Sequence, residues 1–185
     1  MELGERLINE DYRLISGMGL KVGDYVVKGA LLKLYEKRIP AIERYLTLRP
    51  FPRNLPAEIN EPEFNTKYRK DMIAKCGFAI FIAGTSRSHV ESEGVLQEYQ
   101  IAKALNKIPI PIGATGFAAR RVWETMQPEI RNIYSGAVPA RPFKQLNEPG
   151  STNEQLVTAV FEIIRRVSEF PTRHPPSILT KAAAS

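Results

Sequence analysis

The sequence is poor in the residues that build disulfides, metal sites and the common catalytic pairs. Its 185 residues include one cysteine, Cys76, and two histidines, His89 and His174. One cysteine cannot form an internal disulfide, which favours a reducing, cytoplasmic compartment. Neither histidine lies in a recognisable motif with the cysteine or with clustered carboxylates. The sequence therefore predicts no metal site and no cysteine–histidine catalytic pair.

Long apolar runs and targeting signals are also missing. No apolar stretch reaches the roughly 18 residues that a membrane-spanning helix needs. The first five residues, Met1-Glu2-Leu3-Gly4-Glu5, are acidic and do not resemble a secretory signal. We therefore expect a cytoplasmic protein that has no membrane as a partner.

The charge lacks the pattern of a nucleic-acid-binding protein. The net charge is +6, and residues 1–92 and 93–185 each contribute +3. There is no basic tail, no zinc finger and no series of aromatic residues that would stack on bases. Mild, even basicity suits a protein that holds a small polyanion, and a solvated basic surface explains it equally well. Nucleic acid is not expected as a partner.

What the sequence does contain is an alternation of strand and helix patterns. Strands are predicted over residues 12–16, 45–48, 78–83 and 108–112, and helices over residues 2–10, 24–37, 66–75, 91–105, 118–126 and 153–169. Such alternation predicts an α/β fold, a Rossmann-like three-layer sandwich with a mainly parallel sheet. Residues 1–170 are expected to form one domain, and the proline-rich residues 171–185 a flexible tail.

Several local expectations follow from the same patterns. The prolines between residues 50 and 63 predict an irregular segment, with Asn65 capping the next helix. The continuous apolar run at 78–83 predicts a central strand, and Pro109 and Pro111 predict a strand end or sheet edge. Residues 135–153 are expected to be mostly loop. Trp123 and Phe117 are expected to pack in the core rather than to stack on an adenine.

The most informative segment is residues 14–23, LISGMGLKVG, in which a short apolar strand enters a turn with three glycines and a helix follows. Glycines let a backbone approach a phosphate, and a helix N-terminus supplies N–H donors. The spacing is one residue longer than the dinucleotide fingerprint, and the Walker lysine is absent. The turn is either a phosphate site or only a tight connection. Its candidate binding residues are Ser16, Gly17, Met18, Gly19 and Leu20.

Two further predicted strand ends are polar and contain glycine, at residues 84–88 and 113–116. Ligands of parallel sheets bind at the carboxyl ends of strands, which makes Gly84 and Arg87 candidates. Arg69, on the predicted helix 66–75, either binds a phosphate or carboxylate through its guanidinium group or is a solvated arginine. Arg87 either closes over a bound anion or is an exposed loop residue.

Glu98 is the sharpest single candidate. On a helix from residue 91, it shares a face with Gly94, Ile101 and Leu105, toward the core. A carboxylate there needs hydrogen-bond donors, which either ribose hydroxyls or a buried lysine or arginine would supply. The sequence contains no G-x-S-x-G, no H-E-x-x-H and no other catalytic motif. We therefore expect a site that binds a nucleotide without turning it over, with no catalytic and no metal-binding residues.

Four segments carry a family resemblance: residues 15–23 (ISGMGLKVG), 48–52 (LRPFP), 68–73 (YRKDMI) and 94–102 (GVLQEYQIA). Together they resemble the SLOG superfamily, in the branch that associates with Sir2 and TIR domains (STALD) and occurs in the Thoeris antiphage NADase effector. The resemblance extends over about residues 1–170.

The resemblance implies a Rossmann-like sensor of a small nucleotide signal, a cyclic ADP-ribose isomer made by a partner TIR protein, and no other cofactor. Binding would change the packing of a dimer or tetramer and activate a linked Sir2-type NADase. It also implies that Arg69 and Glu98 bind the ligand, with Arg87 standing where relatives have lysine. Because 185 residues leave no room for a Sir2 portion, we expect the sensor domain alone and not an enzyme.

A second SLOG branch, the cytokinin-activating phosphoribohydrolases, has the motif P-G-G-x-G-T-x-x-E. Residues 82–87, IAGTSR, lack its paired glycines and its glutamate. This difference argues against hydrolysis, and a nucleotide N-glycosidase with Glu98 as acid or nucleophile is the alternative hypothesis.

Overall fold

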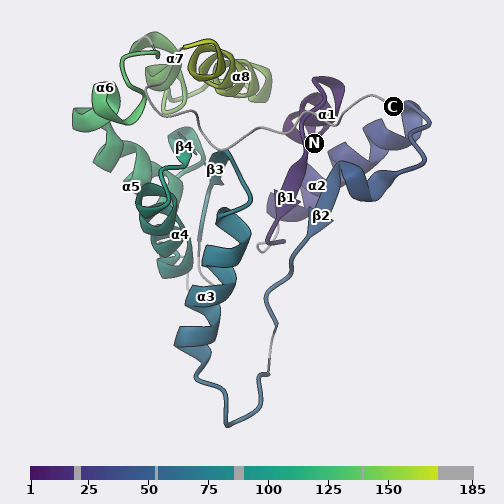
Figure 1. Ribbon diagram of the computed structural model, residues 1–185. Helices are drawn as coiled ribbons and strands as arrows, with labels where there is room; N and C mark the ends of the chain where they lie inside the picture. Colours follow the sequence, from purple (N-terminus) through teal and green to yellow (C-terminus); the bar gives the residue numbers. More distant parts are fainter. Residues whose placement is uncertain (19–21, 53, 86–89, 139, 171–185) are drawn as a thin grey trace. The chain divides into compact units, whose positions relative to one another are not determined.

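The computed structural model describes residues 1–18, 22–52, 54–85, 90–138 and 140–170 (Figure 1). They form two compact units, the first built from Met1–Lys75 and the second from Cys76 onward. Each unit contains helices and a pair of parallel strands, which confirms the predicted α/β, Rossmann-like class. The predicted tail lies outside the described residues, and the extent of a single domain over 1–170 stays a prediction.

The first unit places two parallel strands beside a pair of packed helices. Its elements are α1 (Glu2–Asn9), β1 (Leu14–Ser16), α2 (Val22–Glu36), a 3₁₀ turn (Ile42–Arg44), β2 (Leu46–Leu48) and α3 (Glu61–Ile73). In the β1–β2 pair, Leu14 lies opposite Leu46 and Ser16 opposite Leu48. One cluster of its core consists of Ile8, Val27, Ala30, Leu34 and Leu46.

Two glycines set how closely α1 and α2 approach each other. A Cβ added to Gly4 would overlap the carbonyl oxygen of Val26, and one added to Gly29 would overlap that of Met1. Both glycines are buried. The backbones of the two helices therefore touch directly, with no room for even a methyl group.

Helix α3 begins earlier than the sequence predicted. Its N-cap is Asn60, whose side chain accepts a hydrogen bond from the Glu63 N–H at 3.2 Å, and Pro62 lies within the first turn. The prediction of Asn65 as the cap was wrong because Pro62 was read as a helix breaker. Proline is well tolerated in the first turn, where its missing N–H would have no intrahelical partner.

Replacing the observed cap should destabilise α3 more than replacing the expected one. Asn60→Ala removes the acceptor of the Glu63 N–H and should cost about 1 kcal/mol of unfolding free energy, measured by urea denaturation. Asn65→Ala, inside the helix, is the matched control. A larger loss in Asn65→Ala than in Asn60→Ala would contradict the observed helix start.

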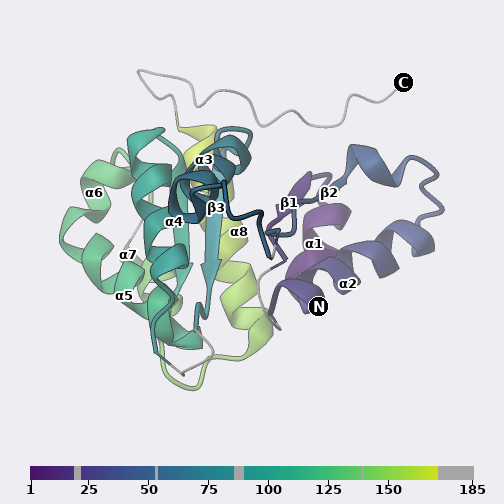
Figure 2. The same ribbon diagram turned by 90° about the horizontal axis from the view of Figure 1, so that it is seen from below.

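The second unit is a parallel strand pair covered by helices. Its elements are β3 (Phe78–Ile82), α4 (Glu93–Ala104), β4 (Ile108–Ile112), a 3₁₀ turn (Gly113–Thr115), α5 (Phe117–Met126), a 3₁₀ turn (Gln127–Glu129), α6 (Ile130–Ile133), α7 (Ala140–Gln145) and α8 (Asn153–Glu169). Helices α4 and α5 pack against both strands, and α8 contacts β4. Figure 2 shows β3 between α4 and α8.

Within the described residues, β3 pairs with β4 alone, and Pro109 and Pro111 lie opposite Ala79 and Phe81. The prolines lack the N–H that a further partner strand would need, which fits the predicted sheet edge. The Tyr134 hydroxyl donates to the Pro109 carbonyl at 2.8 Å. That bond satisfies a buried acceptor on β4.

The core of the second unit confirms some expectations and corrects others. Trp123 is buried, stacks on Phe143 and donates to its carbonyl oxygen at 2.8 Å, as expected of a core residue. Phe117 is 40% exposed, so its expected core position was wrong. Part of the expected loop at 135–153 is helix α7. No helix in the described ranges has the length and apolarity needed to cross a membrane.

Candidate functional site

The candidate site of the first unit lies where β1 and β2 end. The strands are parallel and in register at Ser16 and Leu48, and the Arg49 N–H donates to the Ser16 carbonyl at 2.8 Å. β1 ends at Ser16, and α2 begins at Val22. A helix thus follows the strand closely in the chain, as a phosphate-binding segment between strand and helix requires.

The start of that turn is fixed by Ser16. Its hydroxyl oxygen accepts a hydrogen bond from the Met18 N–H at 3.1 Å, and Met18 has a φ of 49°. A hydroxyl can donate while it accepts, so this bond does not use up the Ser16 proton. Gly23, in the first turn of α2, lies against Met18, because an added Cβ would be 3.2 Å from the Met18 Cα. The N-terminal turn of α2 therefore adjoins the glycine turn.

Aromatic rings join the glycine turn to two arginines. The Arg69 guanidinium carbon lies 4.8 Å from the centre of the Phe51 ring, and that of Arg49 lies 4.6 Å from the centre of the Tyr68 ring. The two rings contact each other edge to face, with 5.0 Å between their centres. The Tyr68 hydroxyl donates to the Pro50 carbonyl at 3.1 Å, which ties α3 to the segment after β2. We call Ser16, Gly17, Arg49, Phe51, Tyr68 and Arg69 the strand-end cluster.

Gly17 faces the middle of this cluster. A Cβ added there would lie 3.4 Å from Phe51 Cε2 and 3.5 Å from Met72 Sδ, which is ordinary van der Waals contact. The ring of Phe51 thus contacts the Gly17 position and also carries the Arg69 guanidinium. Of the predicted residues in the first unit, Gly17 and Arg69 thus adjoin the same Phe51 ring, and Ser16 and Met18 are bonded to each other beside Gly17.

In the second unit, the turn after β3 is tied to the turn after β4. The Ala83 N–H donates to the Thr115 hydroxyl oxygen at 2.7 Å, and the Ala83 carbonyl accepts from the Ala119 N–H at 2.9 Å. The carbonyl of Gly84 accepts from the Ser92 N–H at 2.8 Å. The N–H groups in the first turn of α5 are therefore bonded to carbonyl groups of the segment after β3. Gly84 thus helps to hold the start of α4 and the start of α5 in place.

Gly84→Ala should destabilise the second unit. Its φ is 80°, and an added Cβ would lie 2.8 Å from the Ala118 Cβ and 3.2 Å from the Val95 Cβ. Strain and overlap together should cost about 1–3 kcal/mol in urea unfolding. Gly150→Ala is the matched control, because Gly150 has a φ of 79° with nothing within 4 Å of an added Cβ. Equal losses in the two variants would mean that the contact with Ala118 does not matter.

Glu98 lies in the middle of α4 and is partly buried. Positions 95, 98, 99 and 102 share one face of this helix, and Tyr99 and Ala102 are its buried residues. Glu98 therefore adjoins the buried face of α4, as expected. The most buried residues of that face are Tyr99 and Ala102, whereas the expected Ile101 and Leu105 are only partly buried. Val95, one turn before Glu98, contacts the Gly84 position. Gly84 and Glu98 thus adjoin the same face of α4.

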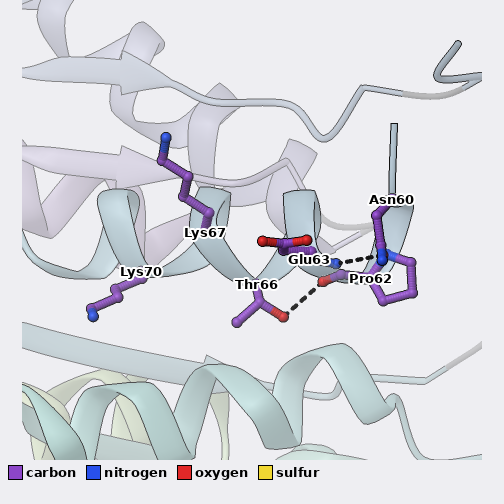
Figure 3. A pocket seen from close by; sticks show the side chains of 6 residues that line it. All are labelled: Asn60, Pro62, Glu63, Thr66, Lys67 and Lys70. Carbon is purple, nitrogen blue, oxygen red and sulfur yellow. Dashed lines mark hydrogen bonds between the residues drawn. The ribbon is translucent and has the colours of Figure 1, made fainter. Parts of the chain in front are cut away.

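A surface hollow at the start of α3 is lined by Asn60, Pro62, Glu63, Thr66, Lys67 and Lys70 (Figure 3). Lys67 and Lys70 point in different directions there, so they do not converge on one anion (Figure 3). The Thr66 hydroxyl donates to the Pro62 carbonyl, and Asn60 caps the Glu63 N–H. This hollow contains none of the predicted binding residues.

Three predicted residues, Gly19, Leu20 and Arg87, lie outside the described residues. Sequence reasoning missed Arg49 and Phe51 as site candidates, although both stood in the LRPFP segment. The signal that could have found them is their position directly after a short strand, where parallel sheets bind ligands.

Parallel strands, a glycine-bearing turn after β1 and covering helices define a Rossmann-like α/β protein. The chain belongs to the Sir2- and TIR-associating SLOG family, STALD, whose sequence profile matches residues 1–167.

The curated relatives are NAD(+) hydrolases named ThsA. The protein from Bacillus cereus (strain MSX-D12) is 33% identical over 172 residues, covering 90% of this chain and 35% of its own length. The protein from Acinetobacter baumannii (strain 532279) is 28% identical over 177 residues, covering 90% of this chain and 37% of its own. That from Cytobacillus dafuensis is 30% identical over 166 residues, covering 88% and 34%. The chain thus spans about a third of the length of these relatives.

Proposed function

We propose that this chain is a nucleotide sensor that binds a cyclic ADP-ribose isomer and leaves it chemically intact. The observation that carries the proposal concerns the Phe51 ring. This ring adjoins the Gly17 position, directly after β1, and also lies under the Arg69 guanidinium. A diphosphate needs close main-chain approach and charged donors. The turn at Ser16–Met18 offers the first, and Arg69 offers the second.

The relatives support a wider role. They are NAD(+) hydrolases, and this chain aligns with about a third of their length. We propose that the sensor is linked to a Sir2-type NADase in a longer antiphage effector and activates it when the signal binds. The chain alone would then not hydrolyse NAD⁺. A cytoplasmic dimer or tetramer is part of the proposal, and light scattering with and without ligand measures the assembly.

Calorimetry on the purified 185-residue chain tests the binding step. We expect saturable binding of at least one cyclic ADP-ribose isomer, and no binding of any isomer at millimolar concentration would contradict the proposal. Glu98 is proposed to accept hydrogen bonds from ribose hydroxyls, so Glu98→Gln should weaken binding. If the chain instead released free base from AMP, and Glu98→Gln abolished that release, the N-glycosidase alternative would replace the sensor.

A further inference from the structure

We propose that Arg49 is a second anion-binding guanidinium, which holds one phosphate of the diphosphate while Arg69 holds the other. The inference rests on the proposed function, because it concerns the same ligand. It goes beyond that function in adding a residue and in dividing the two phosphates between two arginines.

The backbone fixes Arg49 at the edge where the glycine turn begins. Its N–H donates to the Ser16 carbonyl at 2.8 Å, one position beyond the last register pair of β1 and β2. The Ser16 hydroxyl in turn accepts from the Met18 N–H. Arg49 is therefore bonded directly to Ser16, the residue that also holds the Met18 N–H.

The Arg49 side chain lies over the Tyr68 ring, and the Tyr68 ring contacts the Phe51 ring, which lies under Arg69. The guanidinium of Arg49 lies over Tyr68 at 4.6 Å, Tyr68 contacts Phe51 at 5.0 Å, and Arg69 lies over Phe51 at 4.8 Å. A guanidinium that stacks on a ring keeps its N–H donors in its own plane, where they fit phosphate oxygens. Both guanidinium groups are thus held on one contacting pair of aromatic rings.

The charge of Arg49 also has no carboxylate partner: across the described ranges, no carboxylate forms an ion pair with it. Arg49 is only partly exposed, so its charge is less fully hydrated than that of a surface arginine. A diphosphate has one negative charge on each phosphate at neutral pH, which matches the charges of the two guanidinium groups on this pair of rings.

The test is calorimetry with the cyclic ADP-ribose isomer that binds the wild-type chain best. Arg49→Ala should lower the affinity about 10-fold or more, since hydrogen bonds to charged groups have that strength. Lys28→Ala is the control, because it removes the same charge from an exposed position on α2 and should change the affinity less than about 2-fold by the usual weakness of surface charges. Arg49→Gln, which keeps most of the side chain's length, repeats the test if Arg49→Ala fails to fold.

A second readout separates binding from support of the fold. Raising the salt concentration should weaken wild-type binding more than binding by Arg49→Gln, because the variant has lost one ionic contact to screen. Equal affinity and equal salt dependence in wild type and Arg49→Gln would overturn the inference and leave the sensor function standing. If the wild-type chain bound no isomer, the proposed function and this inference would both be wrong.

Discussion

Arg69→Ala should lose most of the affinity for the cyclic nucleotide. Arg69 lies on the same Phe51 ring that contacts Gly17, so its charge is held beside the glycine turn. Charge-assisted hydrogen bonds to phosphate contribute about 1.5–3 kcal/mol each. We therefore expect a loss of roughly 10- to 100-fold in calorimetry, with a bidentate contact at the upper end.

The control for Arg69 is its neighbour. Lys70→Ala changes the net charge equally on the same helix, and Lys70 is exposed, so its affinity should stay within about 2-fold of wild type. Arg69→Lys should bind with intermediate affinity, since lysine keeps the charge and loses the planar fork. If Arg69→Ala and Lys70→Ala bound equally well, Arg69 would not belong to the site.

Gly29→Ala should cause a large loss of stability in the first unit. The added methyl group would overlap the Met1 carbonyl oxygen and lie 2.8 Å from the Met1 carbonyl carbon. Both atoms belong to the backbone, so relief requires Met1 to leave the start of α1 or the two helices to separate. We expect a loss of about 3 kcal/mol in urea unfolding, at the upper end of overpacking effects.

Helix propensity sharpens this test, because it acts in the opposite direction. Alanine in the middle of a helix is favoured over glycine by about 1 kcal/mol. If the close approach of α1 and α2 were not needed, Gly29→Ala would therefore stabilise the protein. Gly17→Ala is the matched control, since its methyl group would make only ordinary contacts with Phe51 and Met72, and its stability should stay near that of wild type.

Most of the fold could be predicted from periodicity and from the apolar runs. The four strands and the long amphipathic helix α8 lie where the patterns placed them, because hydrophobic spacing is a local property of the chain. The errors have tertiary causes. Pro62 was read as a helix breaker, but in the first turn of α3 it is compatible with the helix. Helix α7 packs on α8, a contact that the sequence of residues 140–145 does not reveal.

The candidate site could be predicted in part for similar reasons. Glycines after an apolar strand are visible in the sequence, so Ser16 and Gly17 could be named as candidates. Arg49 and Phe51 were not, because their importance comes from contacts with Tyr68 and Arg69 on α3, which are distant in the chain. Gly84 was found as a candidate for binding, while the structure also gives it a packing task against Ala118.

Phosphorus NMR of a bound cyclic ADP-ribose isomer tests the central claim most directly. With the wild-type chain we predict shifted resonances for both phosphates, smaller shifts with Arg69→Ala, and recovery of unaltered ligand after prolonged incubation. Resonances that do not move at millimolar protein, or a spectrum in which hydrolysis products replace the ligand, would contradict the account of a domain that grips a diphosphate and releases it intact.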